Sequence, residues 1–211
     1  MALDRFQGHF IARYAASFLT LLMLKSDLRK QALKQRRELD DQTLSQLNNL
    51  LLKQFKTLNF STVKSIHVFL PILENNEPNT FLIIDWLQAK YPAIKIVVPK
   101  ADFATSLMSN YLFAGKADLQ NNRYQIPEPQ KAILFDGIPD MVLVPLLAFD
   151  KKGYRVGYGK GFYDRFLQNI ETQKIGLSLF EVIDEINDVH LNDIRLDKCI
   201  TPNGIVKFDA V

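Results

Sequence analysis

The sequence feature that most constrains the fold is a nine-residue apolar run, Met141 to Phe149 (MVLVPLLAF). A strand that is hydrophobic along its whole length is buried on both faces, as in parallel sheets, whereas a half-exposed strand alternates between apolar and polar residues. A glycine-rich segment, a predicted helix at 162–170 (FYDRFLQNI) and a further predicted strand at 174–179 (KIGLSL) follow this run. This order requires a layer of structure on each face of the sheet.

The chain before this run shows the same alternation of predicted helices and strands. Helical patterns cover 25–39 and 41–58, and predicted strands at 63–71 and 94–99 flank a predicted helix at 80–91. We find no repeats and no linker. The sequence therefore predicts a Rossmann-like, three-layer α/β/α domain with a largely parallel central sheet.

The glycine-rich segment, 150–164 (DKKGYRVGYGKGFYD), lies between the predicted central strand and the next helix. Ligands of such sheets bind beyond the carboxyl ends of the strands, where glycine lets the backbone approach phosphate oxygens. Arg155 and Lys160 would supply positive charge, so we expect a phosphate-binding loop. It is not a Walker A loop, because Gly161 follows Lys160, and Phe162 replaces the third glycine of the dinucleotide fingerprint. The spacing alone is equally compatible with tight turns and solvated basic residues.

Composition excludes several classes of protein. The 26 Lys and Arg against 23 Asp and Glu give a net charge of +3, which is too balanced to predict general nucleic-acid binding. The single Cys199 cannot form an internal disulfide, and the three separated histidines lack zinc-ligand spacing. We expect a cytoplasmic protein in which Cys199 is buried and His67 is a satisfied polar or surface residue.

The N-terminal segment Phe10 to Leu24 (FIARYAASFLTLLML) is apolar but short for a membrane span, and it contains Arg13. It also lacks the small-residue cleavage site of a secretory signal. We expect either an appended amphipathic helix or sequence that precedes a natural start at Met23.

The segment 144–167 (VPLLAFDKKGYRVGYGKGFYDRFL) resembles the characteristic motif of the 5-formyltetrahydrofolate cyclo-ligase family, also called 5,10-methenyltetrahydrofolate synthetase. Supporting motifs occur in the same order as in the family: KSDLR (25–29), FLPI (69–72), EPNT (77–80), VPK (98–100), QIPEP (125–129) and NDIRLDKCIT (192–201). The resemblance runs from Met23 to the C-terminus, so we expect residues 1–22 to be an extension and residues 23–211 to form a single catalytic domain.

The resemblance implies ATP-dependent closure of 5-formyltetrahydrofolate to 5,10-methenyltetrahydrofolate, with Mg²⁺ and release of ADP and phosphate. Such a reaction requires alignment and charge neutralisation more than a covalent nucleophile, which agrees with the lack of a Ser-His or Cys-His motif.

The resemblance also implies residue roles. Arg155 and Lys160 are expected to be catalytic, and Asp164 and Asp193 to bind Mg²⁺. The expected nucleotide-binding residues are Lys25, Arg29, Arg155, Gly157, Tyr158, Gly159, Lys160, Gly161, Phe162 and Tyr163. The expected folate-binding residues are Leu70, Glu77, Tyr124, Tyr158, Gly159, Lys160, Gly161 and Phe162.

Two of these assignments have alternatives. The loop before EPNT is longer than is usual in the family, so Glu74 is an alternative to Glu77. Lys25 and Arg29 lie one helical turn apart and can face one site. They could instead belong to a solvated basic face together with Lys30, Lys34, Arg36 and Arg37.

Two other functional classes remain compatible with the residues. A sugar-phosphate or acyl-carrier enzyme on a similar sheet would also use a glycine-rich anion loop, and a nucleic-acid-binding module would use the basic helix at 25–37. We expect a monomer that acts on a small molecule and binds neither nucleic acid nor membrane.

Overall fold

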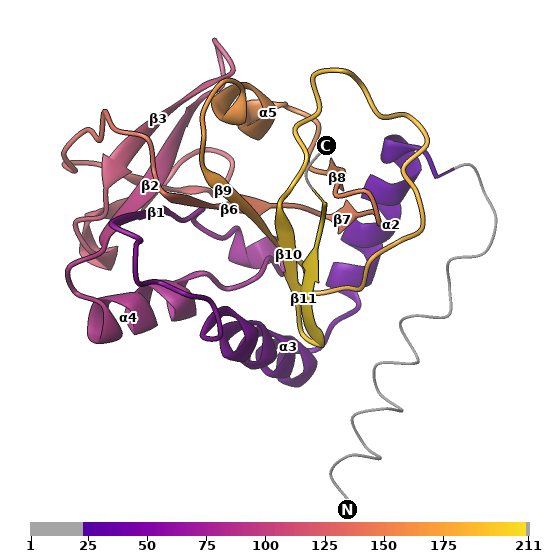
Figure 1. The fold of residues 1–211 in the computed structure, drawn as a ribbon, viewed down its shortest axis with the longest axis horizontal. Coiled ribbons are helices and arrows are strands. Elements are labelled where there is room, and N and C mark those ends of the chain that lie inside the picture. The colour runs from indigo at the N-terminus through magenta and orange to yellow at the C-terminus, as the bar shows by residue number, and fades with distance from the viewer. Residues whose placement is uncertain (1–22, 210–211) are drawn as a thin grey trace, which may run out of the picture.

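The computed structural model describes residues 23–209 and shows a seven-stranded sheet with helices against both faces (Figure 1). The strand order is β11-β10-β9-β6-β1-β2-β3. The helices are α2 (Lys25–Arg37), α3 (Asp41–Phe55), α4 (Phe81–Lys90) and α5 (Phe162–Leu167), with 3-10 turns η1 (Leu73–Asn75) and η2 (Lys116–Asp118). The strands of this sheet are β1 (Ser65–His67), β2 (Lys95–Asp102), β3 (Leu107–Leu112), β6 (Met141–Pro145), β9 (Gln173–Leu177), β10 (Lys198–Thr201) and β11 (Gly204–Lys207).

The centre of the sheet is parallel, as the sequence predicts. Strands β2, β1, β6, β9 and β10 pair in parallel, and only the edge strands β3 and β11 pair antiparallel to their neighbours. The carboxyl ends of the parallel strands therefore meet at one edge of the sheet, where α/β proteins bind ligands.

The surroundings of strand β6 explain why its sequence is apolar throughout. Met141 and Leu143 belong to the core cluster that α3 and α4 share. Val142 and Val144 belong to the opposite cluster, together with Leu167 of α5. Both faces of the strand are buried, and the predicted three-layer α/β/α architecture is confirmed.

The predicted strand Met141–Phe149 is divided in two. β6 ends at Pro145, and β7 (Ala148–Phe149) pairs antiparallel with β8 (Arg155–Val156). The carboxylate of Asp150, which is fully buried, fixes the turn between β7 and β8 by accepting hydrogen bonds from the backbone N–H groups of Lys152, Tyr154 and Ile186. The glycine-rich segment therefore begins in a small hairpin outside the central sheet and continues from Gly157 to α5.

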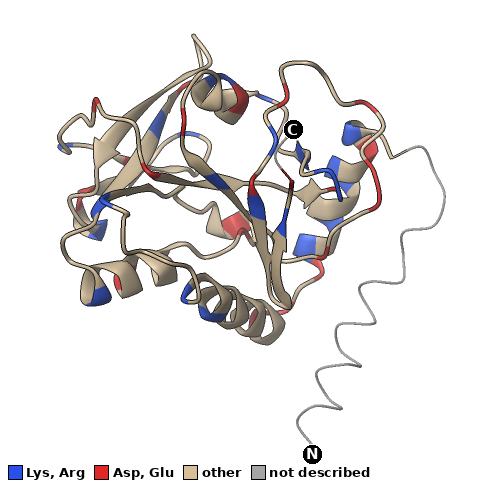
Figure 2. Ribbon diagram, viewed as in Figure 1, with Lys and Arg blue, Asp and Glu red and all other residues tan. Residues whose placement is uncertain are grey.

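Residues 103–140 contain structure that no clear sequence pattern predicted. A hairpin joins β2 to β3, and β4 (Leu119–Asn121) pairs with β5 (Pro127–Pro129) in a separate two-stranded sheet. Lysines and arginines are interspersed with acidic residues over the whole ribbon, with several along α2 (Figure 2). No helix within residues 23–209 is long and apolar enough to cross a bilayer, and the predicted N-terminal helix lies outside the described residues.

The predictions for Cys199 and His67 differ in outcome. Cys199 is fully buried, as predicted. His67 is fully buried too, and neither of its ring nitrogens has a hydrogen-bond partner within residues 23–209. The prediction of a satisfied polar or surface histidine was therefore wrong: His67 lies in an interior strand, and its ring packs against Tyr163 and Phe166 of α5, with centroid distances of 5.7 and 5.1 Å.

Candidate active site

A cavity of about 790 Å³ lies where the glycine-rich loop meets α2, the loop after β1 and the β2–β3 hairpin. Cavities of this size bind ligands as large as a drug or a cofactor. All fifteen residues expected to contact ligand line it: Lys25, Arg29, Leu70, Glu77, Tyr124, Arg155, Gly157, Tyr158, Gly159, Lys160, Gly161, Phe162, Tyr163, Asp164 and Asp193.

The glycine-rich loop packs closely on α2. Arg29 donates a hydrogen bond from Nε to the carbonyl oxygen of Gly157, at 2.9 Å. Gly159 has a φ of 87°, and a Cβ there would lie 3.2 Å from the Arg29 guanidinium. The backbone conformation therefore favours glycine at this position, and a Cβ would also require the Arg29 guanidinium to shift by a few tenths of an ångström.

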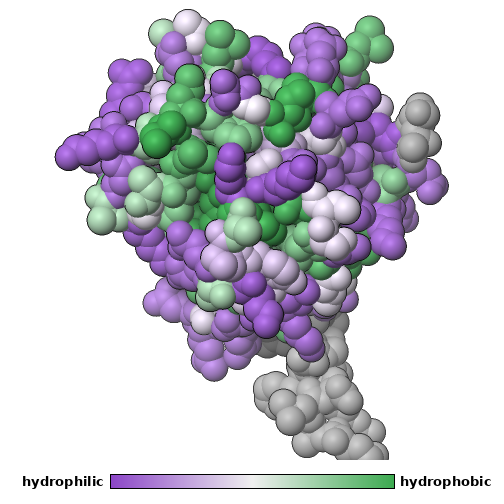
Figure 3. Space-filling view, turned by 60° about the vertical axis from the view of Figure 1, so that its left-hand side comes forward, coloured by the Kyte–Doolittle hydropathy of each residue, from purple (hydrophilic) through white to green (hydrophobic). Residues whose placement is uncertain are grey.

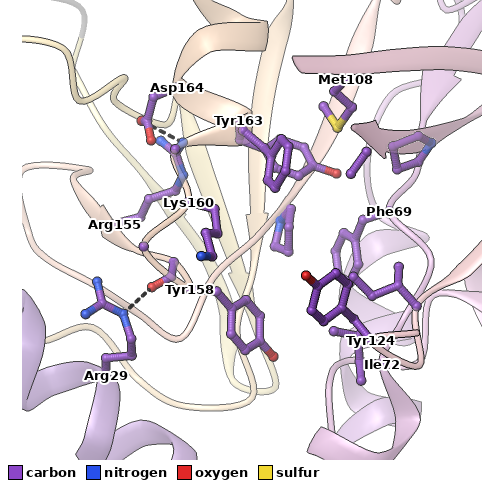
Figure 4. A pocket seen from close by; sticks show the side chains of 18 of the residues that line it. Arg29, Phe69, Ile72, Met108, Tyr124, Arg155, Tyr158, Lys160, Tyr163 and Asp164 are labelled. Atoms are coloured by element: carbon purple, nitrogen blue, oxygen red, sulfur yellow. Dashed lines mark hydrogen bonds and ion pairs between the residues drawn. The ribbon is translucent and has the colours of Figure 1, made fainter. Parts of the chain in front are cut away.

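One half of the cavity is cationic. Arg29, Arg155 and Lys160 lie on the same side of it (Figure 4). Arg155 is held in place by Asp164 at 2.8 Å and by the carbonyl oxygen of Ile194. Lys160 is exposed, and its ammonium group makes no hydrogen bond or ion pair with any residue between 23 and 209, so this group can bind an anion.

The other half of the cavity is apolar and aromatic. Phe69, Ile72, Met108 and Tyr124 face the cations across the cavity (Figure 4). The ring centroid of Phe103, in the β2–β3 hairpin, lies 4.3 Å from that of Tyr124 and 5.2 Å from that of Phe162. Hydrophobic residues gather in a recess bordered by hydrophilic ones on the face drawn in Figure 3. Such a wall suits a flat heterocycle.

Tyr163 contributes its ring to the cavity lining and not its hydroxyl. The hydroxyl oxygen is buried and has no hydrogen-bond partner among residues 23–209, and burial raises the pKa of this phenol well above its usual value. Any contact between Tyr163 and a nucleotide would therefore come from the ring or the backbone.

Glu77 is a buried carboxylate in the cavity wall, 4% exposed. It accepts hydrogen bonds from the Tyr158 hydroxyl at 2.5 Å and from the Ile72 N–H at 2.7 Å. Burial raises its pKa, and Arg36 and these two hydrogen bonds act in the opposite direction. Glu74 is exposed and is not among the lining residues, so the geometry favours Glu77 as the ligand-facing carboxylate.

Arg36 is a site residue that sequence reasoning missed, because it was considered only as part of an alternative solvated basic face. It is 2% exposed and donates a hydrogen bond to the carbonyl oxygen of Leu146 at 2.5 Å. The buried residues of α2 are Leu28, Ala32 and Arg36, four apart. This helical spacing is the signal that could have placed Arg36 on the inner face.

The two expected metal ligands, Asp164 and Asp193, each have one carboxylate oxygen engaged by neighbouring residues. Asp164 Oδ1 pairs with Arg155 and accepts the Ile194 N–H, and Asp193 Oδ2 pairs with Lys25 and accepts the His190 N–H. No hydrogen bond from the described residues reaches the second oxygen of either carboxylate. Within residues 23–209 no group of three acidic, histidine or cysteine residues could hold a metal alone. Mg²⁺ often uses one or two carboxylates and completes its shell with phosphate oxygens and water, so the residues fit it as part of a nucleotide complex.

The fold and the cavity define a class of protein: an α/β enzyme fold in which a glycine-rich, cationic loop and an apolar pocket share the carboxyl edge of a parallel sheet. Within that class, the chain belongs to the 5-formyltetrahydrofolate cyclo-ligase family, whose model matches residues 23–202.

Individual relatives agree with this assignment. The 5-formyltetrahydrofolate cyclo-ligase of Escherichia coli K12 is 38% identical over 97 residues, which is 43% of this chain and 53% of the relative, so this match spans about half of that enzyme. The cyclo-ligase of Mycoplasma pneumoniae is 32% identical over 185 residues, which is 84% of this chain and 98% of the relative. The solved structure of Aquifex aeolicus 5,10-methenyltetrahydrofolate synthetase superposes with a TM-score of 0.76 at 27% identity and covers 90% of this chain and 95% of that one.

Proposed function

We propose that this chain converts 5-formyltetrahydrofolate to 5,10-methenyltetrahydrofolate and couples the closure to cleavage of ATP into ADP and phosphate. The observation that carries the proposal is that one cavity joins a cationic glycine-rich loop to an aromatic wall with a buried carboxylate. A triphosphate and a pteridine are the two chemical shapes that these halves suit.

The chemistry explains why both ligands must meet. The N5-formyl group is amide-like, and its oxygen is a poor leaving group. In the proposed reaction this oxygen attacks the γ-phosphorus, and the bond to the β,γ-bridging oxygen breaks to release ADP. N10 then attacks the formyl carbon and loses its proton, and the carbon–oxygen bond breaks to release phosphate. The protein must align the two ligands and neutralise charge on the transferring phosphoryl group.

The cations of the cavity meet this requirement. Arg155 is fixed by Asp164 and the Ile194 carbonyl, so it needs little reorganisation when charge develops on the transferring oxygens. Lys160 is unpaired among the described residues and can follow the phosphate. Lys25 and Arg29 reach the same cavity from α2 and would bind the rest of the triphosphate. Bound Mg²⁺ would be held by Asp164 and Asp193 and would supply further charge neutralisation.

The apolar half would hold the folate. Leu70, Tyr124 and Phe162 would contact the pteridine, and Phe162 presents a ring without a hydroxyl. Glu77 would accept hydrogen bonds from the pteridine N–H groups near the reacting nitrogens. The aromatic wall distinguishes this proposal from a sugar-phosphate enzyme, which would not need it.

The test is to incubate the purified protein with 5-formyltetrahydrofolate, Mg²⁺ and ATP and to follow the methenyl chromophore in the near ultraviolet. We expect the chromophore to grow only when ATP is present, with one ADP formed per methenyl group. Lys160→Ala should lower kcat/KM, and the loss should correspond to about 2 to 4 kcal/mol of transition-state stabilisation. The matched control is Lys30→Ala, at a lysine whose side chain is 82% exposed on α2, and it should match wild type. Absence of the chromophore, or its formation without ATP, would contradict the proposal.

A further inference from the structure

Arg36 does not line the cavity, but it contacts two residues that do, Tyr158 and Glu77. Its side chain enters from α2 and is 2% exposed. An arginine this deeply buried is rare unless it is paired, because moving its charge out of water is costly. Its position therefore calls for specific partners.

The guanidinium group joins two parts of the site. Its Nη2 donates a hydrogen bond to the Leu146 carbonyl oxygen at 2.5 Å, which anchors the guanidinium just after β6. Its Nη1 lies 3.4 Å from the Tyr158 hydroxyl and 3.9 Å from Glu77 Oε1. Arg36, Tyr158 and Glu77 thus form a connected cluster, defined here as the Arg36 cluster, that links α2, the glycine-rich loop and the loop after β1.

Glu77 is the buried carboxyl group of this cluster, and Arg36 is the cation beside it. The Tyr158 hydroxyl donates to Glu77 at 2.5 Å, and burial raises the pKa of Tyr158, so the phenol keeps its proton and stays a donor. The other groups that face Glu77 are the Ile72 N–H on its own loop and Tyr163 on α5. Arg36 is the only cation among these described neighbours.

We propose that Arg36 is a positioning residue for folate binding, which keeps Glu77 oriented and ionised without touching the substrate. The inference rests on the proposed function, because it concerns the carboxylate that would accept hydrogen bonds from the pteridine. A neutral Glu77 would present a donor where the pteridine N–H groups need an acceptor, so its charge state decides affinity.

The test is to measure the dissociation constant for 5-formyltetrahydrofolate, without ATP, between pH 6 and pH 9. The proteins are wild type, Arg36→Gln, Arg36→Lys and Tyr158→Phe. In Arg36→Gln the Glu77 carboxyl loses its cation, so affinity should fall about tenfold at neutral pH and recover at higher pH. Arg36→Lys keeps a cation and should move the midpoint of this pH profile less. Tyr158→Phe removes one donor to Glu77, leaves α2 intact and should also move the midpoint upward.

ATP affinity separates positioning from general disruption. It should stay at the wild-type value in Arg36→Gln and Arg36→Lys, because Arg36 does not line the cavity and the cations of the phosphate-binding half are not in the Arg36 cluster. Tyr158→Phe keeps the inference testable if Arg36→Gln does not fold. Equal midpoints in wild type and in the folded variants would overturn the inference. Failure of wild type to bind 5-formyltetrahydrofolate at any pH would instead overturn the proposed function.

Discussion

The buried histidine of strand β1 predicts a specific loss of stability in mild acid. His67 has no hydrogen-bond partner for either ring nitrogen among residues 23–209, and burial lowers its pKa from 6.5 to about 3. The unfolded chain therefore binds the proton first. Stability that is present above pH 6.5 is lost as the pH falls toward 3.

The size of this loss follows from the two pKa values. Between pH 7.5 and pH 5, the histidine should remove about 2 kcal/mol from the free energy of unfolding. Carboxylates also contribute to acid lability, so the informative quantity is the difference between wild type and His67→Phe, which cannot titrate and is similar in volume. Urea unfolding at each pH would measure it.

The control for this experiment is His190→Phe, at an exposed position, where the side chain stays in water in both the folded and the unfolded state. This variant should keep the full pH dependence of wild type. His67→Phe should lose about 2 kcal/mol of that dependence, whatever its stability at pH 7.5. Equal pH dependence in wild type and His67→Phe would refute the argument.

Three further predictions concern the site and the core. Glu77→Gln should lower kcat/KM for 5-formyltetrahydrofolate at saturating ATP and leave ATP affinity unchanged. Glu74→Gln, at an exposed position, should stay within about 0.5 kcal/mol of wild type in stability and leave the kinetics unchanged. The reverse pattern would move the carboxylate assignment to Glu74. Arg155→Ala should impair ATP use and also lower the free energy of unfolding by about 1 to 3 kcal/mol, because it leaves a carboxylate and a carbonyl unpaired; wild-type turnover would remove it from the site. Gly176→Ala should lower the free energy of unfolding, measured by chemical denaturation, by about 1 to 3 kcal/mol, because a Cβ would lie 2.6 Å from the side chain of Leu146. Gly204→Ala places its Cβ in open space and should lower it less. Equal losses would contradict the packing argument.

Most of the architecture could be predicted because the parallel strands are apolar on both faces. The run at Met141 required cover on two sides, and the structure supplies α3 and α4 on one face and α5 on the other. The break at Pro145 was not predictable from hydrophobicity, because β7 is as apolar as β6. The β7–β8 hairpin that follows is held by a buried side chain, Asp150, whose three backbone partners are set by tertiary contacts.

The site was predicted as a set of residues but not as a network. Motif resemblance placed Glu77 and Tyr158 in one cavity, and the structure brings them together. Arg36 and His67 were misjudged for a common reason. Polar side chains are usually exposed or satisfied, and one sequence does not show when the packing around them overrides that tendency. The charge of Arg36 is partly balanced by the Leu146 carbonyl and Glu77, although its Nε has no partner among the described residues. Burial of His67 instead favours the neutral ring.

The most direct test of the proposed chemistry is to follow the formyl oxygen. 5-Formyltetrahydrofolate labelled with ¹⁸O in the formyl group would be converted with Mg²⁺ and unlabelled ATP, and the released phosphate analysed by mass spectrometry. Attack of the formyl oxygen on the γ-phosphorus predicts one ¹⁸O in each phosphate released. Unlabelled phosphate, formed together with the methenyl product, would show that ATP cleavage does not activate this oxygen and would contradict the account.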